Sequence, residues 1–121
     1  MNSELNVLVA QKVMGWTLLP KGDLREGCWL DEHNKKLYLV LADFSGDIAQ
    51  AWRVVEKMRE LGWDTTINCH QTARGNSQYL VEMEPLSRDD FHKAVSKSAP
   101  EAICRAALAA VGCEVPAKVP A

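Results

Sequence analysis

The chain has 121 residues, of which 47% are hydrophobic and 25% are charged, which is the balance of one ordinary globular domain. Its formal net charge of −2 excludes long-range attraction of the whole molecule to polyanions, so we expect no long nucleic acid as a partner. The chain shows neither an apolar run of about 18 residues nor a leader pattern. These features predict a cytoplasmic protein without a membrane partner.

The four cysteines are widely spaced and form no C-x-x-C pair. Thiols in the cytosol stay mostly reduced, so we expect them to be small apolar packing residues. A zinc site that uses Cys69 and His70 is disfavoured, because adjacent residues on a strand point to opposite faces. The sequence therefore predicts no metal and no cofactor.

The first predicted helix covers residues 3–14. Its apolar residues recur at helical spacing, with Ser3 as N-cap and Gly15 as a C-terminal stop. Trp16 follows directly and is expected to fold back over the last turn as part of the core. Residues 20–27 combine turn formers with charge and are expected to form a loop.

Two short strands are predicted next, at residues 28–31 and 36–41, joined by a tight hairpin turn. Within the second strand, residues 37–41 read LYLVL, so both alternating faces are apolar. That pattern is typical of a strand covered on both sides. It predicts a sheet that lies between two layers.

The strongest helix signal covers residues 47–61, with Asp47 as the expected N-cap. One apolar stripe is expected to cover the sheet, and charged residues occupy the opposite side of the helix. This stripe consists of Ile48, Ala51, Trp52, Val55 and Met58. Gly62 ends the helix.

A strand at residues 64–70 is expected to return through a hairpin at 72–77 into a strand at 78–84. Residues 91–96 fit either a strand or a helical turn, and we favour an edge strand. The last helix is predicted at 99–111, where Ser98 and Glu101 form a capping box. Residues 1–113 are expected to form one domain, followed by a disordered tail at 114–121.

Three segments in this order resemble the phage α-β-α sandwich domain family of small tailed-phage and prophage proteins. They read VAQKVMGW at 9–16, DIAQAWRVVEKM at 47–58 and SAPEAICRAALAAVG at 98–112. Gly46 departs from the pattern of that family just before the second segment. The resemblance implies a phage origin and a three-layer α-β-α fold, but no activity. With the residue patterns, it predicts an α+β single-domain sandwich with a mostly antiparallel sheet of about 4–5 strands and helices near 3–14, 47–61 and 99–111.

Enzyme signatures are missing from the sequence. It holds no phosphate loop, no dinucleotide fingerprint and no G-x-S-x-G elbow. A two-histidine phosphodiesterase needs H-x-T/S twice, and only the segment 70–72 supplies it. We therefore predict no catalytic residue, while a phosphodiesterase that uses His70 stays as a second alternative.

A binding pocket is better supported, because flat rings next to arginines and a helix N-terminus suit nucleobases and phosphates. The candidate ligand-binding residues are Trp16, Phe44, Ser45, Asp47, Trp52, Arg74, Tyr79 and Arg105. If a ligand binds, we expect it near Ser45 and Asp47. Because Trp52 also belongs to the predicted apolar stripe, a purely structural role is the competing interpretation of this set.

These observations lead to a functional hypothesis. We expect a non-catalytic phage accessory protein in the cytoplasm of the infected bacterial host, which sequesters a small nucleotide immune signal and forms a homo-oligomer. The alternative is a protein-interaction module that docks on a host or phage protein through its alanine-rich last helix.

Overall fold

The computed structural model describes residues 3–32, 36–71, 73–85 and 91–113. The helices are α1 (Ser3–Leu8), its continuation as a π-helix, η1 (Val9–Val13), α2 (Ile48–Glu60) and α3 (Ala99–Ala110). The strands are β1 (Thr17–Leu18), β2 (Trp29–Leu30), β3 (Leu37–Tyr38), β4 (Trp63–Gln71), β5 (Ser77–Pro85) and β6 (His92–Ser96). No helix among these is long and apolar enough to cross a membrane.

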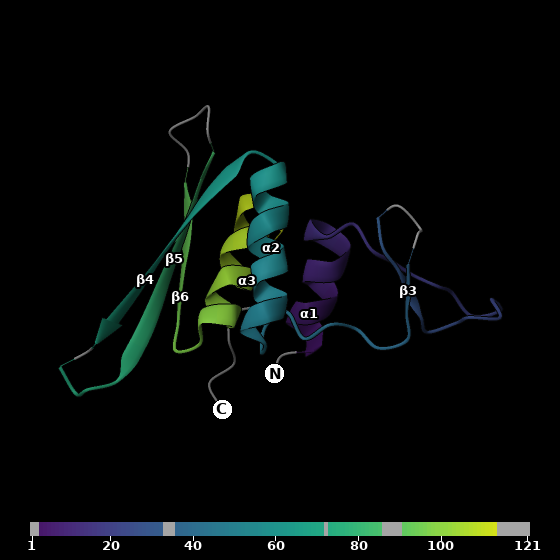
Figure 1. Cartoon of the computed structure of the whole chain (residues 1–121), viewed down its shortest axis with the longest axis horizontal. Helices are drawn as coiled ribbons and strands as arrows, with labels where there is room; N and C mark the ends of the chain where they lie inside the picture. The colour runs from purple at the N-terminus through teal and green to yellow at the C-terminus, as the bar shows by residue number, and fades with distance from the viewer. Residues whose placement is uncertain (1–2, 33–35, 72, 86–90, 114–121) are drawn as a thin grey trace.

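The six strands form two antiparallel sheets, sheet A in the order β1-β2-β3 and sheet B in the order β4-β5-β6. Figure 1 shows the helices standing between the two sheets, with sheet B on the left and sheet A on the right. The predicted α+β sandwich of antiparallel strands and three helical segments is confirmed. Its strands are divided between two sheets of three, where the sequence suggested one sheet of about 4–5 strands.

Sheet B is the larger sheet, and its register fixes which side chains face the helices. All nine residues of β4 pair with β5, from Trp63 opposite Pro85 to Gln71 opposite Ser77. The hairpin between them contains Gly75 at a φ of 80°, a backbone conformation that glycine adopts without a side-chain clash. The predicted edge strand at 91–96 is confirmed as β6.

Helix α3 lies at the centre of the molecule. It contacts β5 and β6 on one side and α2 and η1 on the other. Its fully buried residues are Ala102, Ile103, Cys104, Ala106, Ala107 and Leu108. Small side chains let neighbouring elements approach α3 closely. The alanine-rich face, which the alternative hypothesis treats as a docking surface, is therefore packed against other elements of the same chain.

The apolar stripe predicted for α2 is wrong for two of its members. Ile48 is 53% exposed and Trp52 is 51% exposed. The buried face instead holds Ala51, Val54 and Met58, where α2 packs against α3. The physical reason is that the apolar arc of this helix is wider than the contact, and only the tertiary packing decides which part of the arc is covered.

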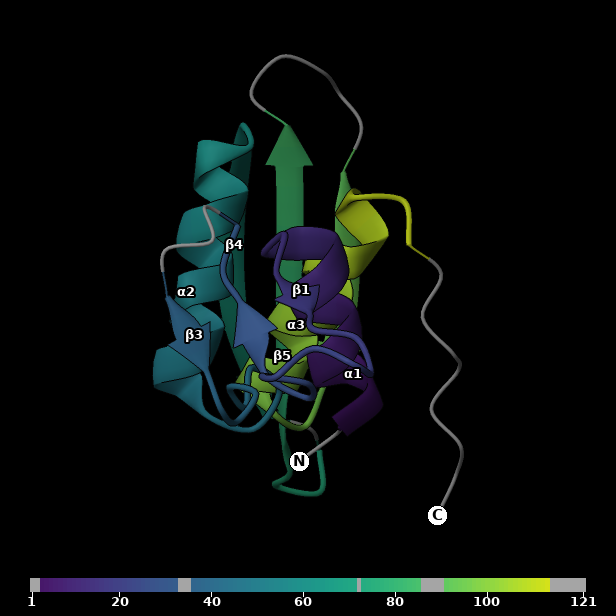
Figure 2. The same ribbon diagram turned by 90° about the vertical axis from the view of Figure 1, so that its right-hand side faces the viewer.

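The prediction of a strand covered on both sides at residues 37–41 is also wrong. Strand β3 ends at Tyr38, and Leu39 and Val40 are 77% and 80% exposed. Each strand of sheet A contributes only two paired residues, so the sheet is too small to lie between two layers. Figure 2 shows it in front of the space between α1 and α2.

The N-terminal helix ends as the sequence predicted. Gly15 has a φ of 73°, which allows the chain to turn back so that the Trp16 amide donates a 2.8 Å hydrogen bond to the carbonyl of Ala10. This turn brings the Trp16 ring against the core, where it is buried. The tail predicted at 114–121 lies outside the described residues.

Candidate functional site

Three aromatic rings join sheet A to the helices. The Trp16 ring stacks on Tyr38 with centroids 4.5 Å apart and an angle of 8° between the planes. The Trp16 and Phe44 rings meet edge to face, with centroids 5.5 Å apart and an angle of 66° between the planes. These offset and edge-to-face geometries are the favourable ones for aromatic pairs. The cluster therefore holds β3 and the loop before α2 in fixed positions.

Arg53 of α2 lies against this cluster. Its guanidinium carbon is 5.3 Å from the ring centroid of Trp16 and 5.9 Å from that of Tyr38. Nη1 donates to the Oε1 of Gln50 at 2.9 Å, and Nη2 donates to the hydroxyl of Tyr38 at 3.5 Å. A guanidinium has five N–H donors in a rigid fork, so these contacts orient the group while using two of its donors.

A groove of about 620 Å³ runs along α2 beside Arg53. It is lined by Met14, Trp52, Arg53, Val55, Glu56, Lys57, Arg59 and Glu60. Its volume lies within the range of small-molecule sites. Three cations and two carboxylates of α2 line the groove, and the half-exposed ring of Trp52 forms part of the wall.

One of these cations, Lys57, contacts the sheet A layer. The ammonium of Lys57 forms an ion pair with Glu32, which follows β2. Just before β3, the ammonium of Lys36 lies 5.4 Å from the Tyr38 ring centroid. The Lys57–Glu32 ion pair therefore joins α2 to sheet A beside the groove.

The N-terminus of α2 is built differently from the expected ligand site. Asp47 is the N-cap, as predicted, and its carboxylate accepts a 2.9 Å hydrogen bond from the Ala49 amide. The side chains of Phe44 and Ser45 are buried. The Ser45 amide donates at 2.8 Å to the Oδ1 of Asn6. This turn is thus occupied by contacts within the chain.

The other candidate residues lie apart from the groove. Arg74 is exposed in the hairpin between β4 and β5, and Tyr79 is half-buried on β5, packed against the core. Arg105 lies on α3. The structure brings Trp16 and Phe44 together, places Trp52 in the nearby groove, and separates them from Arg74, Tyr79 and Arg105.

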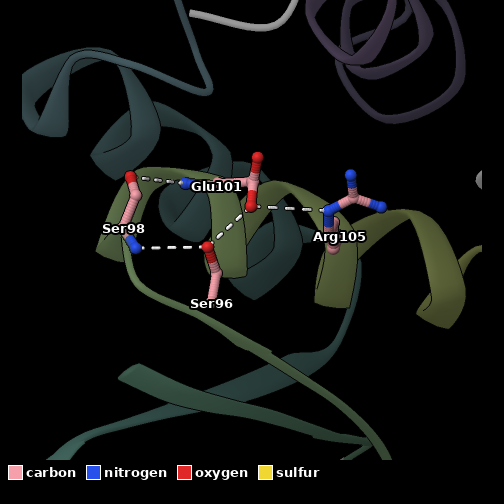
Figure 3. Close-up of polar contacts among 4 residues, drawn as sticks. All are labelled: Ser96, Ser98, Glu101 and Arg105. Carbon is pink, nitrogen blue, oxygen red and sulfur yellow. Dashed lines mark hydrogen bonds and ion pairs between the residues drawn. The ribbon is translucent and has the colours of Figure 1, made fainter. Parts of the chain in front are cut away.

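Arg105 belongs to a structural network at the start of α3 (Figure 3). The hydroxyl of Ser96 donates to Glu101 Oε2 at 2.6 Å, and Arg105 Nε lies 3.8 Å from the same oxygen. The Ser98 hydroxyl accepts from the Glu101 amide at 3.4 Å. These contacts connect the end of β6 to the first two turns of α3, which explains Arg105 without a ligand.

Burial also explains the packing role of the Cys104 thiol. The side chain is fully buried, and desolvation raises its pKa to about 12, with the negative charges of Asp43 and Glu101 adding to the shift. The thiol therefore stays protonated at neutral pH and is a packing group, as predicted. Cys69, in contrast, is exposed on β4, so the prediction of a packing role fails for it.

The histidine at 70 lies exposed on β4, in register with Gln78. His92 lies on β6, opposite Met83, with its ring centroid 5.7 Å from that of Trp63. In the described part of the chain, no group of three or more His, Cys, Asp or Glu residues is arranged to hold a metal ion.

Sequence reasoning missed Gln50 and Tyr38, and it treated Arg53 only as a surface charge. The adjacency of Arg53 to Trp52 was a weak signal, since charged helix residues usually face solvent. The contact of Arg53 with Trp16 joins positions 37 residues apart in the chain, and no local pattern reports such a contact.

Comparison with known proteins gives the family. The model of the phage ABA sandwich domain matches residues 7–108. The chain belongs to this family. A solved structure of a phage protein from Bacillus cereus ATCC 14579 is also similar, with 25% sequence identity and a TM-score of 0.63 over 90% of this chain and 91% of that one. A search of curated proteins finds no match.

Membership confirms the resemblance noted for the three helical segments. The matched range runs from within α1 to within α3, so it includes the aromatic cluster and the groove along α2. The groove is therefore part of the phage ABA sandwich domain itself and not of an added segment.

Proposed function

We propose that this phage ABA sandwich protein binds a small nucleotide in the groove along α2 and sequesters it without chemical turnover. The observation that carries the proposal is the placement of Arg53. Its guanidinium is held between Gln50 and two aromatic rings at the wall of a groove that also presents the Trp52 ring.

Arg53 suits the recognition of a phosphate. A guanidinium that is already oriented loses less conformational entropy on binding than a mobile one. Charge-assisted hydrogen bonds to phosphate are also stronger than neutral ones. Arg59 lines the same groove, whereas the charge of Lys57 is paired with Glu32. Arg53 and Arg59 can thus offer charge-assisted hydrogen bonds to a phosphate group.

Trp52 suits the recognition of a base. About half of its surface is exposed although the ring lines a groove, so a planar ligand can stack on it. Such stacking contributes about 1–3 kcal/mol per base. Glu56 and Glu60 can accept hydrogen bonds from sugar hydroxyls, while they repel a long polyanion. The composition of the groove therefore favours a small nucleotide.

The phage family supports the biological part of the proposal. A bacteriophage gains from removing a nucleotide signal that activates host immunity, and a sponge needs a binding site but no catalytic group. We place its action in the cytoplasm of the infected bacterial host, where such signals are made.

Isothermal titration calorimetry with a panel of cyclic nucleotides and ADP-ribose derivatives tests the proposal. We expect at least one compound to bind and to be recovered unchanged by chromatography. Trp52→Ala and Arg53→Met should each weaken binding at least about tenfold, which is 1.4 kcal/mol. Arg74→Ala is the matched control, because Arg74 is an exposed arginine far along the chain on a hairpin.

Two results would overturn the proposal. One is the absence of binding to every compound in the panel. The other is an equal loss of binding in Arg74→Ala and Arg53→Met, which would move the site away from the groove. Steady conversion of the ligand to a product would instead support the phosphodiesterase alternative, and His70→Ala would then have to abolish the conversion.

A further inference from the structure

We propose that two copies of this chain associate through the free edge of β4, in antiparallel register about Ile67, to form one continuous six-stranded sheet. The proposal concerns sheet B and does not depend on the ligand groove. It identifies the partner at this edge as a second copy of the same chain.

Strand β4 is a long edge. It pairs with β5 on one side, and no other strand of the described residues pairs with its second side. A nine-residue edge presents a row of backbone donors and acceptors, which proteins commonly protect with lysine, proline or a short strand. The opposite edge, β6, has five residues and carries Lys93. Strand β4 has no lysine and no proline, and its one carboxylate is Asp64.

The sequence of β4 is complementary to itself. If two β4 strands pair with Ile67 opposite Ile67, all nine residues pair, from Trp63 opposite Gln71. Asp64 then lies opposite His70, and Thr66 lies opposite Asn68, on the face away from the helices. On the other face, Thr65 lies opposite Cys69. Opposite polar and charged partners across strands stabilise a sheet by about 0.2–1 kcal/mol per pair.

Other registers are poorer. Two residues that lie opposite each other must point to the same face of the sheet. Alternative registers therefore differ in which residue of β4 lies opposite its own copy, and that central residue moves one position at a time. A centre at Thr66 places Asp64 opposite Asn68, and a centre at Asn68 places His70 opposite Thr66. Both shifts lose the carboxylate–imidazole pair and shorten the overlap. The register about Ile67 is therefore the one that the side chains favour.

An apolar residue lies at the centre of the same seam. Ile67 is 38% exposed at the middle of the strand. Helix α2 covers β4, whereas α3 covers β5 and β6.

The mass of the protein in solution tests the proposal. Light scattering coupled to size-exclusion chromatography should give a dimer for the wild-type chain at high micromolar concentration. Ile67→Lys places two like charges together at the centre of the seam, so it should give a monomer. Val95→Lys is the matched control, because Val95 is an exposed apolar residue on the other edge strand, and this variant should remain dimeric.

A cross-link tests the register and does not require loss of the dimer. Thr65→Cys should form an intermolecular disulfide with Cys69 under mild oxidation, since the Cβ atoms of directly opposite residues approach to about 4.5 Å, which is the upper end of the distance that a disulfide spans. Adding Cys69→Ser should abolish the cross-link. In the wild-type chain, the two copies of Cys69 lie four residues apart along the seam, about 13 Å, so they should not be linked.

The proposal is overturned by a monomeric wild-type chain, or by a folded Ile67→Lys variant that stays dimeric. A cross-link of Thr65→Cys that persists after Cys69→Ser would also overturn it. If Ile67→Lys does not fold, as judged by circular dichroism, the two cross-linking variants decide the question alone.

Discussion

The Oδ1 of Asn6 accepts a 2.8 Å hydrogen bond from the backbone amide of Ser45, and both residues are buried. The Nδ2 of the same side chain donates to Asp43 Oδ1 at 3.0 Å. The side-chain amide of Asn6 on α1 thus forms hydrogen bonds with two groups of the loop that leads into α2. The position of that helix, and with it the groove, depends on this contact.

Asn6→Ala should lower the free energy of unfolding by about 1–3 kcal/mol, because the buried Ser45 amide loses its acceptor. Urea denaturation monitored by tryptophan fluorescence measures the change. Gln11→Ala is the control, since Gln11 is exposed on η1, and it should change stability by less than about 0.5 kcal/mol. Equal effects of the two substitutions would contradict the role of Asn6.

Gly46→Ala should destabilise the chain through Asp43. A Cβ at Gly46 would lie 2.3 Å from Asp43 Oδ2, so the carboxylate would have to move and its hydrogen bond with Asn6 would be lost. We expect a loss of about 1–3 kcal/mol. In an Asp43→Ala background the same substitution should cost far less, and a double-mutant cycle measured by urea denaturation gives the coupling. Additive effects would contradict this account.

Ser98→Ala should destabilise α3 by about 1 kcal/mol, because its first turn loses the side-chain acceptor of the Glu101 amide. Ser98→Asp keeps an acceptor at this position and should retain most of the stability. Thermal unfolding followed by circular dichroism compares the two variants. An equal loss in both would show that the cap is unimportant here.

The buried thiol of Cys104 should make stability fall at high pH. Below pH 9 the thiol is protonated in both the folded and the unfolded chain, so it adds no pH dependence. Between pH 9 and about 12 only the unfolded chain releases the proton. Each pH unit in that window therefore favours unfolding by about 1.4 kcal/mol from this group alone.

Cys104→Ala should remove this part of the slope when the free energy of unfolding is measured between pH 8.5 and about 10.5. Cys28→Ala is the control, because Cys28 is only half-buried in the loop before β2, and it should keep the wild-type slope. An unchanged slope in Cys104→Ala would contradict the assignment.

Several elements could be predicted from the sequence because their signals are local. Asp47 and Ser98 cap α2 and α3 as expected, since a cap needs only a side-chain oxygen beside the first free amides. The hairpin at Gly75 and the stop at Gly15 follow from the freedom of glycine at positive φ. The strand at 91–96 was harder to predict, because a segment of six residues fits both the strand and the helix period.

The candidate site could be predicted only in part. Trp16 was correctly expected in the core, but its stacking on Tyr38 and its contact with Arg53 depend on how sheet A folds onto α2. Trp52 was assigned both to the apolar stripe and to the ligand set, and the structure places it half-exposed in the groove. Arg105 was predicted to bind a ligand because it is a cation, but its guanidinium lies beside the carboxylate of Glu101.

The sequence by itself determined the family, the helices and most of the strands, because periodicity, caps and turn residues act over a few neighbouring positions. Only the tertiary structure decided that the strands form two sheets, that α3 is buried, and that Arg53 lies between Trp16, Tyr38 and the groove. These relationships depend on which part of each apolar surface finds a partner. That choice is made by packing among residues far apart in the chain.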